Sequence, residues 1–99
     1  MDRVYLVTFQ QGDWDDYSWG IHCITSTKEK AQEKIDELKD RIQNIKTQYF
    51  LEFGRDYDTD IAKMFELDIE ERHDQLYLYQ ARYEELKYHT IKIEEKQVI

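Results

Sequence analysis

Residues 31–49 read AQEKIDELKDRIQNIKTQY, and this stretch decides the fold. Its apolar positions are separated alternately by four and three residues. They are Ala31, Ile35, Leu38, Ile42, Ile45 and Tyr49. Because an α-helix completes a turn in 3.6 residues, this spacing places all of these side chains on one narrow stripe, where a second helix can pack. The sequence contains no proline that would interrupt the helix.

The same spacing returns in the second half of the chain. The apolar positions there are Ala62, Phe65, Ile69, Leu76, Tyr79, Tyr83 and Leu86, and Arg72 fills the polar slot. Two stripes joined by a short turn predict an antiparallel helical hairpin of the coiled-coil type. We expect its helices over residues 27–52 and 59–87.

Residues at the predicted helix ends support these boundaries. Ser26 and Glu29 have the spacing of a capping box, in which each side chain satisfies an amide of the first turn. Gly54 suits the left-handed conformation that commonly follows a helix. Asp58 or Thr59 is suited to cap the second helix.

Three shorter segments have the composition of β-strands, over residues 3–9, 17–24 and 89–95. The first is apolar on both faces, which is typical of a central strand. In the second, one predicted face carries Tyr17, Trp19, Ile21 and Cys23, and the other carries Ser18, Gly20, His22 and Ile24. We therefore predict one α+β domain over residues 1–99, with a small antiparallel sheet in ββααβ order and a long helical hairpin.

The predicted helices are longer than the predicted sheet. They would measure about 35–40 Å, whereas three short strands span only about 20–25 Å. We therefore expect the protruding stripe to be covered in a homodimer. The expected self-association residues are Ile35, Leu38, Ile42, Ile45, Ile69, Leu76 and Tyr79. Alternatively, the first helix breaks near Thr47 and Gln48 and the residues that follow fold back over the core.

The chain has 22 acidic and 14 basic residues and a net charge of −8. A negative field of this size repels phosphate backbones and attracts basic protein surfaces, so we expect a protein partner and no direct nucleic-acid binding. The single cysteine excludes an internal disulfide and fits a reducing compartment. No apolar run is long enough to cross a bilayer, so we expect a cytoplasmic protein with no membrane contact.

The acidic residues do not form a recognisable metal motif. Asp56, Asp58 and Asp60 alternate like the start of a calcium loop, but Ile61 replaces the required glycine and Leu67 replaces the required glutamate. A capping turn explains these carboxylates better. The chain also lacks a glycine-rich phosphate loop and a nucleophile elbow, so we expect no enzymatic activity and no cofactor.

A helical histidine gives a second possible metal position. Glu66, Glu70 and His73 share one predicted helix face. A metal site needs three or four converging ligands, and the sequence supplies no clear further one. An exposed polar face is the simpler interpretation.

The segment DWDDYSW, residues 13–19, is the leading candidate for a binding site. A tryptophan among aspartates at a hairpin tip has the composition of an interface hot spot, with an aromatic anchor surrounded by charge. Alternatively, Trp14 covers the edge of the sheet. The expected partner-binding residues are Asp13, Trp14, Asp15, Asp16, Trp19, Asp56, Asp58, Asp60, Glu66 and Glu70.

Parts of the first third of the chain resemble a known group of proteins. These parts are Val4-Tyr5-Leu6-Val7-Thr8, the acidic hairpin with Asp16-Tyr17, and Ser26-x-x-Glu29-Lys30-Ala31. They are similar to small uncharacterised phage and prophage proteins, in which a short β-hairpin leads into an S-x-E-K-A-type helix. Here the serine and glutamate are one residue further apart, and the second helix is longer. The resemblance implies an accessory protein of a phage or mobile element, such as an inhibitor of host defence, and it implies no site residue.

These observations predict a non-enzymatic interaction protein that binds a host protein through acidic and aromatic surfaces. One alternative is an oligomeric protein that binds or sequesters a nucleotide, for which Arg3, Arg72 and Arg82 would supply positive charge. Another alternative is a homodimer with a purely structural role.

Overall fold

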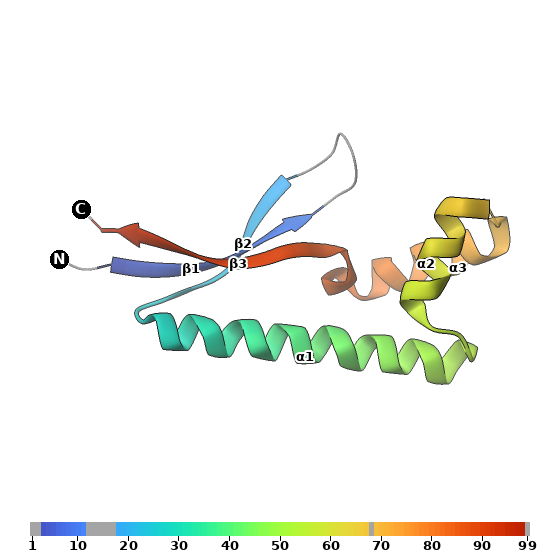
Figure 1. The fold of residues 1–99 in the computed structure, drawn as a ribbon, viewed down its shortest axis with the longest axis horizontal. Coiled ribbons are helices and arrows are strands. Elements are labelled where there is room, and N and C mark those ends of the chain that lie inside the picture. The colour runs from blue at the N-terminus through green and yellow to red at the C-terminus, as the bar shows by residue number, and fades with distance from the viewer. Residues whose placement is uncertain (1–2, 12–17, 68, 99) are drawn as a thin grey trace. The chain divides into compact units, whose positions relative to one another are not determined.

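The computed structural model describes residues 3–11, 18–67 and 69–98 (Figure 1). Its elements are β1 (Arg3–Gln11), β2 (Ser18–Thr25), α1 (Lys28–Phe53), α2 (Tyr57–Leu67), α3 (Glu70–Arg82), the 3₁₀ turn η2 (Glu84–Lys87) and β3 (Tyr88–Gln97). The strands form an antiparallel sheet in the order β2-β1-β3. This confirms the predicted α+β class and the ββααβ order.

The chain separates into two compact units. Unit 1 contains residues 1–40 and 87–99, and unit 2 contains residues 41–86. Unit 1 therefore holds the sheet and the first half of α1, whereas unit 2 holds the second half of α1 with α2, α3 and most of η2. The prediction of one domain over residues 1–99 stays a prediction.

In unit 1, β1 is the central strand, as its apolar character on both faces predicted. Val7 is fully buried and clusters with Ala31 and Ile35 from the first half of α1. Tyr5, Cys23, Ile91 and Ile93 pack around this cluster. The helix thus covers one face of the sheet, and Cys23 is a small, partly buried residue packed against this core.

A β-bulge in β2 changes the predicted assignment of its faces. Cys23 pairs with Val7, but Ile21 pairs with Thr8, so His22 is an extra residue opposite this step of β1. The bulge places Ile21 on the opposite face from Cys23. The prediction that Trp19, Ile21 and Cys23 share one face is therefore wrong.

Gly20 allows an aromatic ring to lie across β2. It pairs with Phe9, and a Cβ atom at Gly20 would lie 2.5 Å from the Phe9 ring. The same ring stacks on Tyr88 of β3, with 3.9 Å between the ring centroids. The absence of a side chain at Gly20 thus makes room for the Phe9–Tyr88 stack.

Helix α1 is continuous, so the alternative of a break near Thr47 and Gln48 is wrong. Its cap is Thr27, whose Oγ1 accepts a hydrogen bond of 3.2 Å from the Lys30 amide. This corrects the predicted capping box, which assigned the cap to Ser26. After the helix, Gly54 has φ +67°, as expected of a left-handed terminal residue.

The core of unit 2 joins the second half of α1 to α3. Its buried residues are Ile45, Tyr49, Tyr57, Leu76, Tyr79 and Leu86. The Tyr49 ring meets the rings of Tyr57 and Tyr79 edge-on, and the Tyr79 hydroxyl donates a hydrogen bond to the Ile45 carbonyl. The predicted stripes of apolar residues therefore meet each other in this region.

The second predicted helix is divided, which corrects the prediction of one helix over residues 59–87. Helix α2 ends at Leu67, and α3 begins after the extended residue Ile69. The cap of α2 is Asp56, which accepts hydrogen bonds from the amide and hydroxyl of Thr59, so neither Asp58 nor Thr59 is the cap.

Because α2 is a separate helix, its buried stripe differs from the predicted one. Tyr57, Asp60, Ile61 and Met64 face the core with the spacing i, i+3, i+4 and i+7. The predicted positions Ala62 and Phe65 are exposed instead.

The predicted self-association surface is wrong for most of its residues. Ile35, Leu38, Ile45, Leu76 and Tyr79 are buried within the single chain, and Ile42 and Ile69 are partly buried. Side chains that are already covered cannot form the helical interface of the expected homodimer without unfolding the core.

Candidate functional site

Asp60 lies in the interior of unit 2 and is only 1% exposed. Its Oδ2 accepts hydrogen bonds of 2.6 Å from the Tyr49 hydroxyl and 2.8 Å from Arg55 Nε. Arg55 also donates to Gln75 across 2.8 Å. Asp60 therefore belongs to an internal network, and its predicted role as a surface contact for a partner is wrong.

This network changes the proton affinities of two of its members. Burial opposes ionisation of Asp60, but the hydrogen bonds from Tyr49 and Arg55 and the charges of Arg55 and Arg72 outweigh it, so the pKa of Asp60 is lowered. Burial and the adjacent Asp60 carboxylate raise the pKa of Tyr49 to about 12. Asp60 is thus a stable anion, and Tyr49 a persistent donor, at neutral pH.

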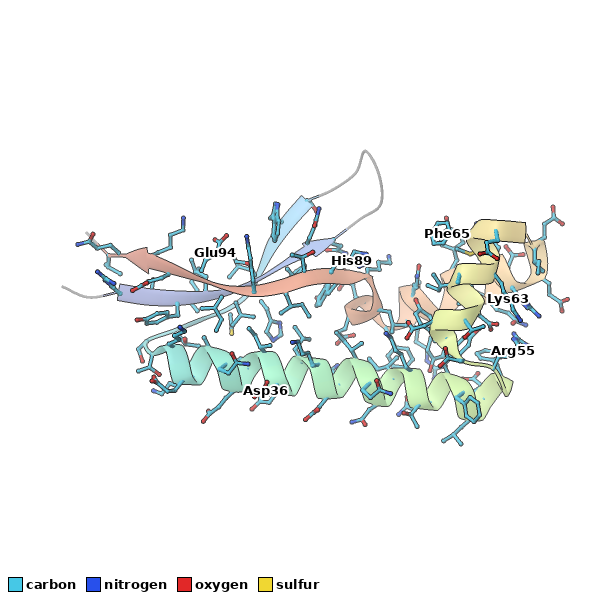
Figure 2. The ribbon with its side chains drawn as sticks, viewed as in Figure 1. Asp36, Arg55, Lys63, Phe65, His89 and Glu94 are labelled. Carbon is cyan, nitrogen blue, oxygen red and sulfur yellow. The ribbon has the colours of Figure 1, made fainter. Side chains whose placement is uncertain are left out.

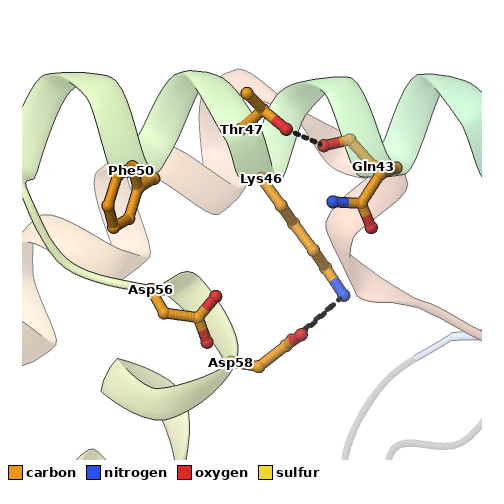
Figure 3. A pocket seen from close by; sticks show the side chains of 6 residues that line it. All are labelled: Gln43, Lys46, Thr47, Phe50, Asp56 and Asp58. Carbon is orange, nitrogen blue, oxygen red and sulfur yellow. Dashed lines mark hydrogen bonds and ion pairs between the residues drawn. The ribbon is translucent and has the colours of Figure 1, made fainter.

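A pocket of about 230 Å³ lies between α1 and the start of α2 in unit 2 (Figure 3). It is lined by Gln43, Lys46, Thr47, Phe50, Asp56 and Asp58. Lys46 and Asp58 form an ion pair of 3.0 Å, and Asp56 is engaged as the cap of α2. These contacts stabilise the junction between the two helices. Asp56 and Asp58, two of the predicted partner-binding residues, therefore have a structural role within the fold.

Helix α3 presents an exposed face that combines acidic and apolar residues. This α3 face consists of Glu70, Glu71, Asp74, Tyr77, Leu78 and Ala81. Tyr77 is 57% exposed and Leu78 is 73% exposed. The centroids of the Tyr77 and His73 rings lie 4.3 Å apart. This contact restricts the position of the Tyr77 ring. Of the predicted partner-binding residues, Glu70 lies on this face, and Glu66 is exposed on α2.

No known protein family, curated protein or solved structure matches this chain. Within the described residues, no three or more His, Cys, Asp or Glu side chains are grouped so as to hold a metal ion. No helix in the described ranges has the length and apolar character needed to cross a membrane.

The second exposed apolar surface lies in unit 1, on the sheet face opposite the first half of α1. Trp19, Ile21 and Ile24 of β2 are 54%, 59% and 62% exposed. They pair with Gln10, Thr8 and Leu6, which alternate along β1 and so share one face. On the other side of β1, the same face carries Lys92, Glu94 and Lys96 of β3.

We call this surface the open sheet face. Figure 2 shows Glu94 on the side of the sheet away from α1. Lys92 extends toward β2, and its Nζ lies 4.5 Å from the centroid of the Trp19 ring. Between them, Thr8 is 5% exposed, and its Oγ1 has no hydrogen-bond partner among the described residues.

The remaining predicted site residues are distributed as follows. Asp13, Trp14, Asp15 and Asp16 lie outside the described residues. Trp19 belongs to unit 1, whereas the other predicted partner-binding residues that are described belong to unit 2.

The sequence did not indicate either exposed apolar face as a whole, although Trp19 was among the expected partner-binding residues. Leu78 lies off the apolar stripe of its helix, and this was a usable signal, because a large aliphatic residue on a polar face is unusual. The open sheet face had no such signal, because strict alternation placed Trp19 and Ile21 on the same predicted face as Cys23.

Proposed function

We propose that this chain is a non-enzymatic interaction protein and that its α3 face binds a basic surface of another protein. The observation that carries the proposal is the exposure of Tyr77 and Leu78 on the same helix face as three acidic residues that precede them, Glu70, Glu71 and Asp74. Large apolar side chains that the fold leaves uncovered, with charges around them, have the composition of an interface hot spot.

The charge of unit 2 favours a basic partner. Residues 41–86 include eleven acidic and six basic residues, which gives this unit a net charge of −5. Such a field accelerates association with a positive surface and disfavours acidic competitors. Glu70, Glu71 and Asp74 would supply specificity, and Tyr77 and Leu78 would supply most of the binding energy.

The resemblance of the first third of the chain to phage and prophage proteins supports a bacterial host protein as the partner. In that setting the chain would act as an accessory or inhibitory protein in the host cytoplasm. The nucleotide-binding alternative has weaker support, because two of its three candidate cations have other contacts. Arg3 pairs with Glu95, and Arg82 lies over the ring of Tyr83.

The proposal is tested by photo-crosslinking from position 78 in an extract of the host. A photoreactive amino acid replaces Leu78, and a control protein carries it at Leu51, which is also exposed in unit 2. We expect one dominant protein to be crosslinked from position 78 and not from position 51. The same protein should be lost when salt screens the acidic residues.

Binding of the purified partner then distinguishes the α3 face from the rest of the acidic surface. The triple variant Glu70→Lys, Glu71→Lys, Asp74→Lys should weaken binding by about 10- to 100-fold. The matched control reverses Glu33, Asp36 and Glu37, which are exposed acidic residues of α1. Equal losses in both variants, or crosslinking to the same proteins from positions 51 and 78, would exclude the α3 face as the site.

A further inference from the structure

We propose that the open sheet face is a homodimer interface, in which two copies of the chain pack sheet to sheet about a two-fold axis. This inference uses residues of unit 1 and is independent of the partner proposed for the α3 face. It also differs from the predicted helical seam, whose residues are mostly buried.

The fold leaves apolar side chains uncovered on the open sheet face. Trp19, Ile21 and Ile24 are each more than half exposed on one face. Their neighbours on β1, Leu6 and Thr8, lie on the same face but are buried, so the exposed apolar surface is formed by β2. Antiparallel sheets commonly cover such a face by packing on a second sheet about 10 Å away.

The charge of the open sheet face also favours a second copy as its partner. The chain has a net charge of −8, so two copies repel each other over most of their surfaces. On the open sheet face, Lys92, Glu94 and Lys96 alternate in sign along β3. This region is close to neutral, and a second copy can approach it without the repulsion that the acidic helices would produce.

The open sheet face is also self-complementary. Ile24, Leu6 and Glu94 form one row across the three strands, and Ile21, Thr8 and Lys92 form the next row of the same face. A two-fold axis that lies between the sheets, perpendicular to the strands and midway between the rows, exchanges the rows. Such an interface is isologous, so each contact occurs twice.

This symmetry specifies the contacts. It places Ile21 against Ile24 of the second copy and Lys92 against Glu94 of the second copy. Apolar residues thus meet apolar residues, and opposite charges meet, on both sides of β1. Nζ of Lys92 lies 3.5 Å from Oε1 of Glu94 within one chain. A two-fold partner would therefore complete a cluster of four charged side chains.

The expected dimer is weak. A face only three strands wide, with neighbouring strands about 4.8 Å apart, offers less area than the roughly 800 Å² per partner of a standard interface. We therefore expect monomer and dimer to exchange, with a balance that depends on protein concentration. An apolar β2 edge beside a charged β3 edge also fixes the relative orientation of the two sheets.

The test is a charge exchange at Lys92 and Glu94, followed by sedimentation velocity over a range of concentrations. Lys92→Glu alone and Glu94→Lys alone each place like charges against one another, and each should weaken dimerisation at least about tenfold. An equimolar mixture of the two single variants should form a dimer with one copy of each. The double variant Lys92→Glu, Glu94→Lys should dimerise like the original chain.

Rescue in the mixture separates a contact between copies from a folding defect, because a misfolded variant cannot be repaired by its counterpart. Circular dichroism of each variant provides an independent check of folding. Leu51→Ser, which removes an exposed apolar side chain outside this face, is the control and should leave dimerisation unchanged. A chain that is monomeric at all concentrations, or single variants that are not rescued by mixing, would overturn the proposal.

Discussion

The hydroxyl of Tyr49 and Nε of Arg55 donate hydrogen bonds to the same oxygen of Asp60, across 2.6 Å and 2.8 Å. Tyr49 comes from α1, Asp60 from α2, and Arg55 from the segment between the two helices. The carboxylate therefore ties together both helices and their connection. A buried charge that loses one of its partners destabilises a protein more than the loss of an ordinary contact does.

Tyr49→Phe should lower the free energy of unfolding by about 1.5–3 kcal/mol, the usual contribution of a hydrogen bond to a charged group. The ring is retained, so the contacts with Tyr57 and Tyr79 persist. Urea unfolding followed by circular dichroism measures the change. Tyr83→Phe is the matched control, because its hydroxyl makes a longer, exposed bond of 3.4 Å to Gln48; losses of equal size would contradict the assigned importance of the network.

Alkaline pH should destabilise the chain partly through Tyr49. Its pKa is about 12 in the folded protein and near 10 in the unfolded chain. The neutral hydroxyl therefore contributes stability that is complete below about pH 10 and is lost as the pH rises toward 12. Urea unfolding between these pH values should show a smaller decline for Tyr49→Phe than for the original chain. The decline should persist in part, because burial also raises the pKa of Tyr79.

Acidic pH should act through Asp60. Its pKa is lowered in the folded protein, so its ionised form contributes stability above its ordinary pKa of about 4. This contribution is lost as the pH falls through the lower, folded value. Asp60→Asn removes the titrating group and should flatten the pH dependence of unfolding below about pH 4. A pH dependence below about pH 4 that is as steep for Asp60→Asn as for the original chain would contradict this assignment.

Alanine should destabilise the chain at Gly20 and Gly54 for different reasons. At Gly20, the new Cβ would lie 2.5 Å from the Phe9 ring, and we expect a loss of about 1–3 kcal/mol. At Gly54, no atom lies within 4 Å, but φ is +67°, and left-handed backbone costs alanine about 1 kcal/mol. The double variant Gly20→Ala, Phe9→Leu should recover part of the first loss, and no variant at Phe9 should recover the second. Urea unfolding measures each loss.

Thr8→Val should stabilise unit 1. The hydroxyl of Thr8 is buried and has no hydrogen-bond partner within the described residues. An unpaired buried hydroxyl costs about 1–3 kcal/mol, and valine has nearly the same shape. We expect the midpoint of thermal unfolding to rise by at least about 4 °C, because each kcal/mol shifts it by roughly 4–8 °C in a domain of this size. A lower midpoint would show that the hydroxyl has a partner.

The elements predicted well from the sequence are those with one dominant periodic signal. The pattern of residues 31–49 gave the length of α1 almost to the residue, and the two apolar faces of β1 gave its central position. Gly54 was recognisable because few other residues adopt a positive φ at a helix end.

The division of the second helix was harder to predict. Ala62 and Phe65 have the spacing that extends the apolar stripe of α3 toward the N-terminus. The pattern therefore indicated one long helix and concealed the separate buried stripe of α2. That stripe begins at Tyr57 and includes Asp60, a charged residue that a search for apolar periodicity rejects. Asp60 is compatible with the interior only because Tyr49 and Arg55 satisfy it, and these partners are 11 and 5 residues away.

One of the candidate surfaces depended on the same kind of local detail. The open sheet face exists because β2 has an extra residue opposite β1, and no composition rule locates a bulge. The open sheet face therefore required three-dimensional information that periodicity alone does not contain. The α3 face is different, because Tyr77 and Leu78 lie off the apolar stripe that contains Leu76 and Tyr79, and the buried residues of α3 follow that stripe.

The bulge at His22 has a consequence for how this strand tolerates changes in length. Losing one codon from a strand normally turns every later side chain over to the other face. At position 22 the reverse holds, because the surplus residue stands outside the ladder and Ile21 would remain opposite Thr8. A variant that lacks His22 would keep the same side chains on each face of the sheet, and its β2 strand would be straighter.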